Sequence, residues 1–312
     1  MMENLKIGNL HLKHRTILAP MASLTDIVFR RVVDEIGGVG LMVTELISAE
    51  GLRRKQDRTL SMIRSFDFNT PQFIQLFGSE PESFTDAVKY IEEETDFSGI
   101  DINMGCPVRK VIKKRAGAAL LKHPKKIGEI CRQVRKVISI PFTVKIRLGY
   151  EEENVFEILK VLENEGVDAV TVHFKLKTDK YGSKAKWEYA EKIKEWSGLK
   201  IIGNGNILNR DEALEKLNIV DGIMIGRGAI NNPFIFAEIQ NEIISPEYKK
   251  EIIERIMTLV EEYYPPELRL LRIKAITKYI AFGQPNIKKI KHKVYVSKTF
   301  DDVKQFFREL DF

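Results

Sequence analysis

Eight short apolar runs that alternate with helical stretches constrain the fold of this chain more than any other feature. The runs are TILAP (16–20), LMVTELI (41–47), QFIQLFG (72–78), GIDINMG (99–105), FTVKIRL (142–148), AVTVHF (169–174), KIIGNG (200–205) and GIMIGRG (222–228). Nearly continuous apolar composition is typical of parallel strands that are covered on both faces. Helical periodicity is clearest at 82–94, 124–138, 154–165 and 210–217 and weakest at 50–65. Eight strand–helix units predict an α/β protein with a (β/α)8 TIM barrel.

The end of the first run argues against a doubly wound sheet. A doubly wound dinucleotide-binding sheet has a glycine-rich turn after its first strand, whereas this run ends in Pro20. Two short alternating runs within 4–13 predict a small hairpin ahead of the barrel. Helix caps are predicted at Thr25, Ser79 and Asn209.

The pattern changes near the carboxyl terminus. Beyond residue 245 no strand is predicted, and helical periodicity is interrupted at 265–266 and at 283–285. Three or four helices are expected there, and they would form a separate bundle. The predicted organisation is a barrel domain at 1–242 and a helical bundle domain at 243–312.

The predicted helical domain carries an unbalanced block of positive charge. Nine cationic residues and no acidic residue lie from Arg269 to Lys298, with Tyr279, Phe282 and Tyr295 interleaved. A solvated helix face is one interpretation, but a block of this length favours a surface that contacts a phosphate backbone. The formal net charge of +6 agrees with a polyanionic partner without requiring one. The nine are Arg269, Arg272, Lys274, Lys278, Lys288, Lys289, Lys291, Lys293 and Lys298.

The two cysteines, Cys106 and Cys131, have the spacing of neither a metal site nor a disulfide framework. This usage favours a reducing compartment. The amino terminus has no apolar signal core, and no run reaches the roughly 18 apolar residues of a membrane span. We therefore expect a soluble cytoplasmic protein without a metal site.

Polar residues collect where the predicted strands end. In a barrel of this kind, the carboxyl ends of the strands form the face that carries function. Amide, cationic, imidazole and thiol groups follow successive strands there, which favours one composite site over chance. The candidates are Pro20, Met21, Ala22, Glu45, Gln75, Asn103, Cys106, Lys145, Arg147, His173, Asn204, Gly205, Asn206, Gly226 and Arg227.

Glycine-rich loops follow the seventh and eighth strands. In GNGN (203–206) and GRG (226–228) the backbone is bare enough for a phosphate to reach main-chain N–H groups. Either loop alone is more often a tight turn that needs glycine. Because the loops after the last two strands are the usual phosphate site of this fold, the pair favours a phosphate-bearing ligand.

Lys145 lies within an apolar strand, so its ammonium group needs an anionic or carbonyl partner. The electron-rich edge of a flavin is one such partner. An internal salt bridge to Asp101 or Glu45 is the alternative. Gln75 can bond to a carbonyl or imide edge of the same ring, and His173 is either a ligand contact or a satisfied core residue.

Cys106 follows the fourth strand in the segment NMGCP. A single cysteine is most often an inert small hydrophobe, and a nucleophilic role would require a histidine base that this segment does not supply. A proton donor only has to stay protonated, as a thiol with a pKa of about 8.5 does at neutral pH. Reduction of a conjugated C=C bond needs a hydride and a proton, which a flavin and a facing thiol would supply.

These segments resemble the landmarks of the tRNA-dihydrouridine synthase family in order and spacing. The resemblance covers nearly the whole barrel, and NMGCP is its most specific part. In the carboxyl-terminal helices only the architecture and the basic character match. The segments are LAPMASLTD (18–26), QLFG (75–78), INMGCPVRKV (102–111), AGAALLKHP (116–124), TVKIRLG (143–149), TVH (171–173), IGNGNI (202–207) and IGRG (225–228).

The resemblance implies an FMN-bound barrel, reduced by NADPH or NADH, that converts uridine in tRNA to 5,6-dihydrouridine. Cys106 would be the general acid that protonates C5 of uracil after hydride from the flavin reaches C6. Asn103 would contact the uracil or the flavin edge, and the target base would be extruded from the folded tRNA. The implied FMN contacts are Pro20, Met21, Ala22, Gln75, Lys145, His173, Asn204, Gly205, Asn206, Gly226 and Arg227. The implied tRNA contacts, by shape and phosphate, include Arg109, Lys110, Lys288, Lys289 and Lys291.

Two positions depart from the family pattern. Asn206 stands where the family usually has Asp, and 174–178 replaces a short Arg-Thr pattern after His173. Both leave the details of phosphate binding open, because Lys cannot reproduce a bidentate Arg contact.

Two other functions stay open at this point. An FMN barrel that acts on a free small molecule, such as a dihydropyrimidine, would have no use for the nine carboxyl-terminal cations. A non-catalytic tRNA-binding barrel would have no use for Cys106 and Lys145. For the enzyme that acts on tRNA, a monomer is expected.

Overall fold

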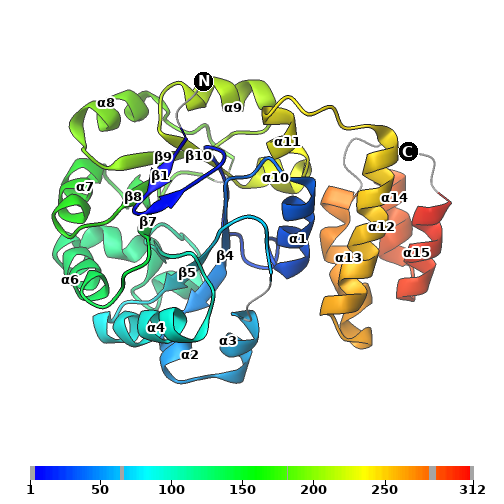
Figure 1. The fold of residues 1–312 in the computed structure, drawn as a ribbon, viewed down its shortest axis with the longest axis horizontal. Helices are drawn as coiled ribbons and strands as arrows, with labels where there is room; N and C mark the ends of the chain where they lie inside the picture. Colours follow the sequence, from blue (N-terminus) through cyan, green and yellow to red (C-terminus); the bar gives the residue numbers. More distant parts are fainter. Residues whose placement is uncertain (1–3, 64–66, 181, 281–285, 310–312) are drawn as a thin grey trace.

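The computed structural model describes residues 4–63, 67–180, 182–280 and 286–309, although not the side chains of 278–280. Its parallel strands are β3 (Thr16–Leu18), β4 (Leu41–Ser48), β5 (Gln72–Phe77), β6 (Gly99–Asn103), β7 (Phe142–Gly149), β8 (Ala169–Leu176), β9 (Lys200–Asn204) and β10 (Gly222–Ile225). They follow one another around a closed barrel in chain order, and β10 returns to pair with β3. Helices surround the strands (Figure 1). The predicted (β/α)8 TIM barrel is therefore confirmed.

Helices cover the outside of the barrel, and all four of the clearest helical stretches are confirmed. The weak stretch at 50–65 contains two short helices instead of one long one. The helices are α1 (Ile27–Ile36), α2 (Ala49–Arg53), α3 (Asp57–Met62), α4 (Pro81–Glu94), α5 (Arg109–Ile112), the 3₁₀ helix η1 (Gly117–Lys122), α6 (Pro124–Arg135), α7 (Val155–Asn164), α8 (Glu188–Trp196), α9 (Arg210–Leu217), α10 (Arg227–Asn231) and α11 (Ile235–Ile239).

The predicted helix caps are correct at one position and displaced by one residue at two. Asn209 caps α9, and its side chain accepts the backbone N–H three residues on. The cap of α1 is Asp26 and not Thr25, because the Thr25 hydroxyl accepts the N–H of Met21 at 2.9 Å and shapes the preceding loop. The cap of α4 is the residue after Ser79, and its side chain makes no capping hydrogen bond.

Apolar side chains pack on both sides of the barrel wall. An outer cluster joins the strands to the helices, and an inner cluster that includes Phe73 fills the barrel. The predicted hairpin is present as β1 (Lys6–Ile7) and β2 (Leu10–His11), and Ile7 joins the inner cluster. The hairpin lies beside the first residues of β8 and β10, so it covers the amino end of the barrel and leaves the carboxyl end for ligands.

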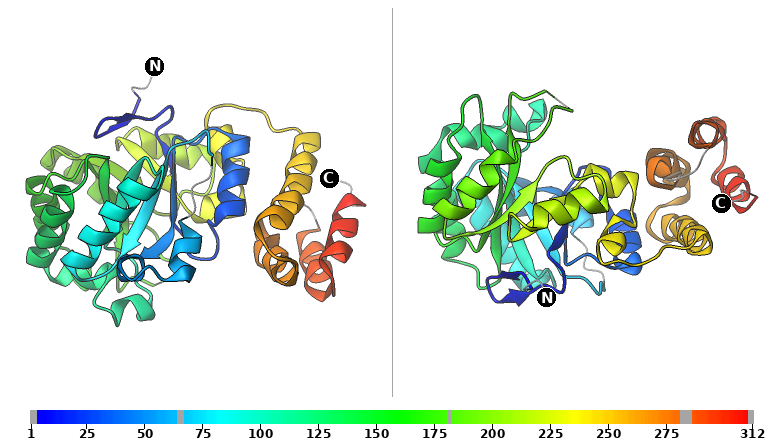
Figure 2. Two further views of the ribbon diagram at one scale, coloured as in Figure 1. Left: turned by 60° about the horizontal axis from the view of Figure 1, so that its bottom comes forward. Right: turned by 90° about the horizontal axis from the view of Figure 1, so that it is seen from above.

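Four helices follow α11 in the described part of the chain: α12 (Pro246–Tyr263), α13 (Pro266–Ile280), α14 (Ile287–Val296) and α15 (Phe300–Arg308). They lie together at one side of the barrel, where α12 packs on α1 and α13 contacts α10 (Figure 2). The break predicted at 265–266 separates α12 from α13, whereas the one at 283–285 lies outside the described residues. The boundary predicted after residue 242 falls between α11 and α12. None of the described helices combines the length and the apolar composition that a bilayer crossing requires.

Candidate functional site

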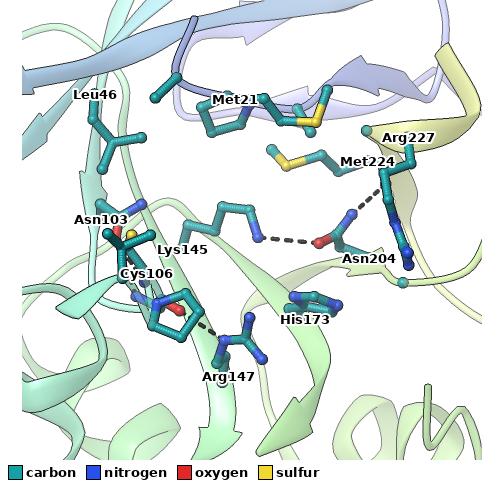
Figure 3. Close-up of a pocket in the computed structure, with 18 of the residues that line it drawn as sticks. Met21, Leu46, Asn103, Cys106, Lys145, Arg147, His173, Asn204, Met224 and Arg227 are labelled. Carbon is teal, nitrogen blue, oxygen red and sulfur yellow. Dashed lines mark hydrogen bonds between the residues drawn. The ribbon is translucent and has the colours of Figure 1, made fainter. Parts of the chain in front are cut away.

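A cavity of about 380 Å³ opens at the carboxyl ends of the barrel strands (Figure 3). Its volume lies within the range of small-molecule sites in proteins. The structure gathers nearly all of the predicted barrel residues around it. Those that line it are Pro20, Met21, Ala22, Asn103, Cys106, Lys145, Arg147, His173, Asn204, Gly205, Asn206, Gly226 and Arg227.

The cavity is cationic. Lys145 and two arginines line it, and the described lining residues include no Asp or Glu. Lys145 Nζ donates to Asn204 Oδ1 at 3.1 Å, and no ion pair between described residues joins it to Asp101 or Glu45. Burial, and after it the charge of Arg147, lowers the pKa of Lys145 to about 8. The alternative of an internal salt bridge is thus not found, and the cavity suits an anionic ligand.

His173 stands among these cations. Burial lowers the pKa of its imidazole well below the usual range, and the charges of neighbouring cations, with Lys145 first, lower it further. The ring is therefore neutral at neutral pH, with one nitrogen as a donor and the other as an acceptor. It offers a hydrogen-bonding group that adds no charge to the cavity.

The two glycine-rich loops keep side chains away from the backbone at the cavity edge. Gly205 has a φ of 134°, and a Cβ there would lie 2.7 Å from the Cβ of Ala185. A Cβ at Gly226 would lie 3.2 Å from the sulfur of Met21. Asn206 Oδ1 is buried and has no hydrogen-bond partner among the described residues. Such atoms are uncommon in proteins, and a ligand group at this loop would complete the hydrogen bonding.

Cys106 lies at the cavity edge on a loop that is held from several directions (Figure 3). Its carbonyl accepts the N–H of Ala118 at 3.0 Å, and the carbonyl of Gly105 accepts Arg147 Nε at 2.7 Å. Gly117, with a φ of 60°, allows the close approach, since a Cβ there would lie 2.8 Å from the Cys106 carbonyl oxygen. Burial raises the pKa of the Cys106 thiol, so the group is protonated at neutral pH.

Gln75 was predicted to contact a cofactor, but the structure does not bring it into the cavity. Its side chain is fully buried beneath the cavity. Nε2 donates to Asp101 Oδ2 at 2.6 Å, and Oε1 accepts Asn103 Nδ2 at 2.9 Å. Both ends of the amide are engaged by the protein, so Gln75 reaches the cavity only through Asn103.

The predicted contacts with a polyanion lie on two exposed surfaces. Arg109 and Lys110 are exposed on α5, and Lys288, Lys289 and Lys291 are exposed on α14. Their charges are accessible to a large partner that approaches from the solvent.

The nine-cation block is only partly such a surface. Arg272 is buried in an ion pair with Asp26, and Arg269 and Lys274 donate to backbone carbonyls of neighbouring helices and loops. These cations therefore make contacts within the protein. The side chain of Lys278 lies outside the described residues.

Two kinds of lining residue were not given a role from the sequence. Arg147 lies two residues after Lys145 and therefore on the same face of β7. That spacing predicts that both side chains point into the cavity. Val108 and Leu208 form an apolar rim, with exposed fractions of 53% and 47%. Single apolar residues in loops carry no signal in a sequence, because their exposure is known only from the fold.

Comparison with known proteins identifies the family. The family described as "Dihydrouridine synthase (Dus)" matches residues 17–311. A probable tRNA-dihydrouridine synthase of Rickettsia bellii is 35% identical over 267 residues, which cover 83% of this chain and 81% of that protein. The tRNA-dihydrouridine synthase B of Escherichia coli is 32% identical over 295 residues, which cover 90% of this chain and 91% of that protein.

The fold has relatives among solved structures as well. The old yellow enzyme homologue from Zymomonas mobilis has a TM-score of 0.54 at 12% identity, over 78% of this chain and 94% of that one. At this identity the likeness concerns the fold. On the family match and the two sequence relatives, the chain belongs to the dihydrouridine synthase family of oxidoreductases.

Proposed function

We propose that this chain is an FMN-dependent tRNA-dihydrouridine synthase, which reduces the C5=C6 bond of specific uridines in tRNA with NADPH or NADH. The observation that carries the proposal is the composition of one cavity. Its described lining combines cations without a carboxylate, bare backbone after the last two strands, and a thiol that stays protonated. The names of the relatives from Rickettsia bellii and Escherichia coli support tRNA as the substrate.

The residues of the cavity fit FMN. Lys145 would meet the electron-rich edge of the ring, and the loops at Gly205 and Gly226 leave room for the phosphate to accept main-chain N–H groups. The unpartnered Oδ1 of Asn206 can accept a hydrogen bond from a hydroxyl group of FMN. When bound, FMN supplies the hydride that reaches C6 of uracil. The other proposed contacts are Pro20, Met21, Ala22, His173, Asn204 and Arg227.

Cys106 holds the proton of the reaction on Sγ. Because burial raises the pKa of the thiol, the proton is present at neutral pH and is transferred to C5 of uracil only when a basic carbon develops there. Asn103, which lines the same edge, would orient the base or the ring. The thiolate then regains a proton from solvent, since Cys106 is only half-buried.

The tRNA would be held outside the cavity. In this proposal residues 1–242 form the catalytic domain and 243–312 the tRNA-binding domain, and the enzyme works as a cytoplasmic monomer. Arg109 and Lys110 near the cavity and the α14 cations would contact phosphates, while the target uridine is extruded into the barrel mouth. Extrusion is required because a stacked base cannot reach a thiol at the cavity edge.

The test is direct. The purified chain is incubated with FMN, NADPH or NADH, and tRNA that lacks dihydrouridine, and the modified uridines are mapped by mass spectrometry. The expected result is a mass gain of two hydrogen atoms at specific uridines. A colourless protein that binds tRNA without this product would favour a non-catalytic binding protein, and reduction of free pyrimidines alone would favour a small-molecule enzyme.

A further inference from the structure

A line of hydrogen bonds crosses three neighbouring strands and ends on the backbone of Cys106. The hydroxyl of Thr143 donates to Asp101 Oδ1 at 2.6 Å. Gln75 Nε2 donates to Asp101 Oδ2 at 2.6 Å, and Asn103 Nδ2 donates to Gln75 Oε1 at 2.9 Å. Asn103 Oδ1 then accepts the N–H of Cys106 at 2.9 Å and that of the preceding residue at 3.2 Å.

These side chains are shielded from water. The exposed fraction is 0% for Gln75, 1% for Asp101, 4% for Thr143 and 5% for Asn103. Asp101 is paired in register with Gln75 on one side and with Thr143 on the other, so the three side chains point to the same face of the barrel wall. A polar group that loses its hydrogen-bond partner here cannot form a replacement hydrogen bond to water.

Every bond along the line has a fixed direction. The backbone N–H groups of Gly105 and Cys106 can only donate, so the oxygen of Asn103 faces them and its nitrogen faces Gln75. At the other end an oxygen of Asp101 accepts, so Gln75 turns its nitrogen there. Both ends require the same orientation of the two amides, and a reversed amide would set two donors or two acceptors against each other.

We propose that Asp101 is a positioning residue for the reaction. Through Gln75 it fixes the direction in which Asn103 presents its amide oxygen, and that oxygen holds the Cys106 loop with the thiol toward the cavity. The role of the thiol rests on the proposed function, and this inference adds what sets its position. Asp101 does not line the cavity, so it acts without touching the ligand.

Asn103→Asp tests the direction of the line. The new carboxyl still accepts the two backbone N–H groups, but it turns an acceptor toward Gln75 Oε1, whose orientation Asp101 fixes. While Asp101 is ionised, only the protonated form of the new acid fits, so the loop should loosen as pH rises through the pKa of the new carboxyl. Adding Asp101→Asn supplies a donor at the far end and lets the Gln75 amide turn round. The ionised form then fits, and the double variant should keep the loop ordered at neutral pH.

The readout is loop order in the flavin-loaded protein. Hydrogen exchange at the amides of Gly105 and Cys106 and alkylation of Cys106 by iodoacetamide are followed from acid to neutral pH. Cys131 is fully buried, and peptide masses separate the two thiols. At neutral pH we expect Asn103→Asp to be alkylated about tenfold faster than the parent chain, and the double variant to return to within about twofold.

Two further variants keep the test decisive. Asp101→Asn alone keeps an acceptor toward Gln75 if its amide turns its oxygen to Gln75 and its nitrogen to the Thr143 hydroxyl, which can accept as well as donate. The direction of the line is then kept, and this variant reports on folding. With Gln75→Met in place, the order of the loop in Asn103→Asp should no longer depend on the residue at position 101. The proposal would be overturned if Asn103→Asp loosened the loop equally with Asp or Asn at position 101. It would also be overturned if Asp101→Asn still restored loop order to Asn103→Asp in the presence of Gln75→Met, because the effect would then arise from charge alone. No tRNA or turnover is involved, so the outcome does not depend on whether the chain reduces uridine in tRNA.

Discussion

The barrel mouth and the exposed side of α14 both carry positive charge, but they hold it in opposite ways. Lys145 is partly buried, bonded to Asn204, and its pKa is lowered to about 8. Lys288 and Lys291 are exposed to solvent. A fixed, desolvated cation distinguishes one ligand from another, whereas a solvated cation on a long side chain attracts any polyanion and is screened by salt. Substitutions at the barrel mouth should therefore change the reaction, whereas substitutions on α14 should change the affinity for tRNA.

The largest effect is expected at the barrel mouth. Cys106→Ala should lower dihydrouridine formation by about 100-fold to 10,000-fold, which is the contribution of a positioned general acid, and leave flavin and tRNA binding intact. Mass spectrometry of tRNA measures the product, and visible absorption measures the flavin. Cys131→Ala, on α6 and outside the cavity lining, is the control thiol. Unchanged turnover of Cys106→Ala would remove that residue from the role of general acid.

One buried contact joins the carboxyl-terminal helices to the loop that precedes α1. Arg272 Nη2 on α13 lies 2.5 Å from Asp26 Oδ1, and each of the two side chains is 7% exposed. Arg272 Nη1 also donates to the carbonyl of Ser23 at 3.0 Å, and the hydroxyl of Tyr264 donates to Asp26. Because Ser23 directly follows the cavity residue Ala22, the carboxyl-terminal helices hold part of the rim of the site.

Arg272→Ala should lower the free energy of unfolding by about 3–5 kcal/mol, because it removes the ion-pair partner of a buried carboxylate, which keeps its other hydrogen bonds. Lys291→Ala, an exposed cation on the next helix, should change it by no more than about 0.5 kcal/mol. Urea unfolding of the two variants measures the difference. A loss of stability for Arg272→Ala as small as that for Lys291→Ala would show that this pair does not join the regions.

The same contrast explains how much could be predicted from the sequence. Lys145 and His173 line the cavity as predicted, because a polar residue in an apolar strand is positioned by its own neighbours in the chain. Gln75 and Arg272 take their roles from partners that are distant in sequence, Asp101 and Asp26. A strand-end amide looks the same whether it faces a ligand or a buried carboxylate. A cation in a basic block looks the same whether it faces solvent or an interface.

A smaller effect is expected on the exposed side of the helices. The paired change Lys288→Glu and Lys291→Glu should weaken tRNA binding and reduce the slope of log affinity against log salt by about 2, one for each phosphate that these lysines would neutralise. Reduction of the flavin by NADPH should stay normal. The matched control is Lys6→Glu with Lys13→Glu, which makes the same charge change at two exposed lysines in and beside the amino-terminal hairpin. Impaired flavin reduction with undiminished tRNA affinity would contradict the proposed role of these lysines in tRNA binding.

The smallest effect concerns the ionisation of the buried cation. With its pKa lowered to about 8, Lys145 is charged at neutral pH and loses its proton as pH rises through that value. If its ammonium group holds FMN, the affinity for FMN should fall above pH 8, by at most about tenfold for each pH unit because a single proton is lost. Lys145→Arg keeps its charge throughout and should bind FMN with a flat profile. Fluorescence titration between about pH 7 and about pH 9 compares the two. A constant affinity in the parent chain, or the same decline in the arginine variant, would place the titrating group elsewhere and separate the Lys145 ammonium from the ligand.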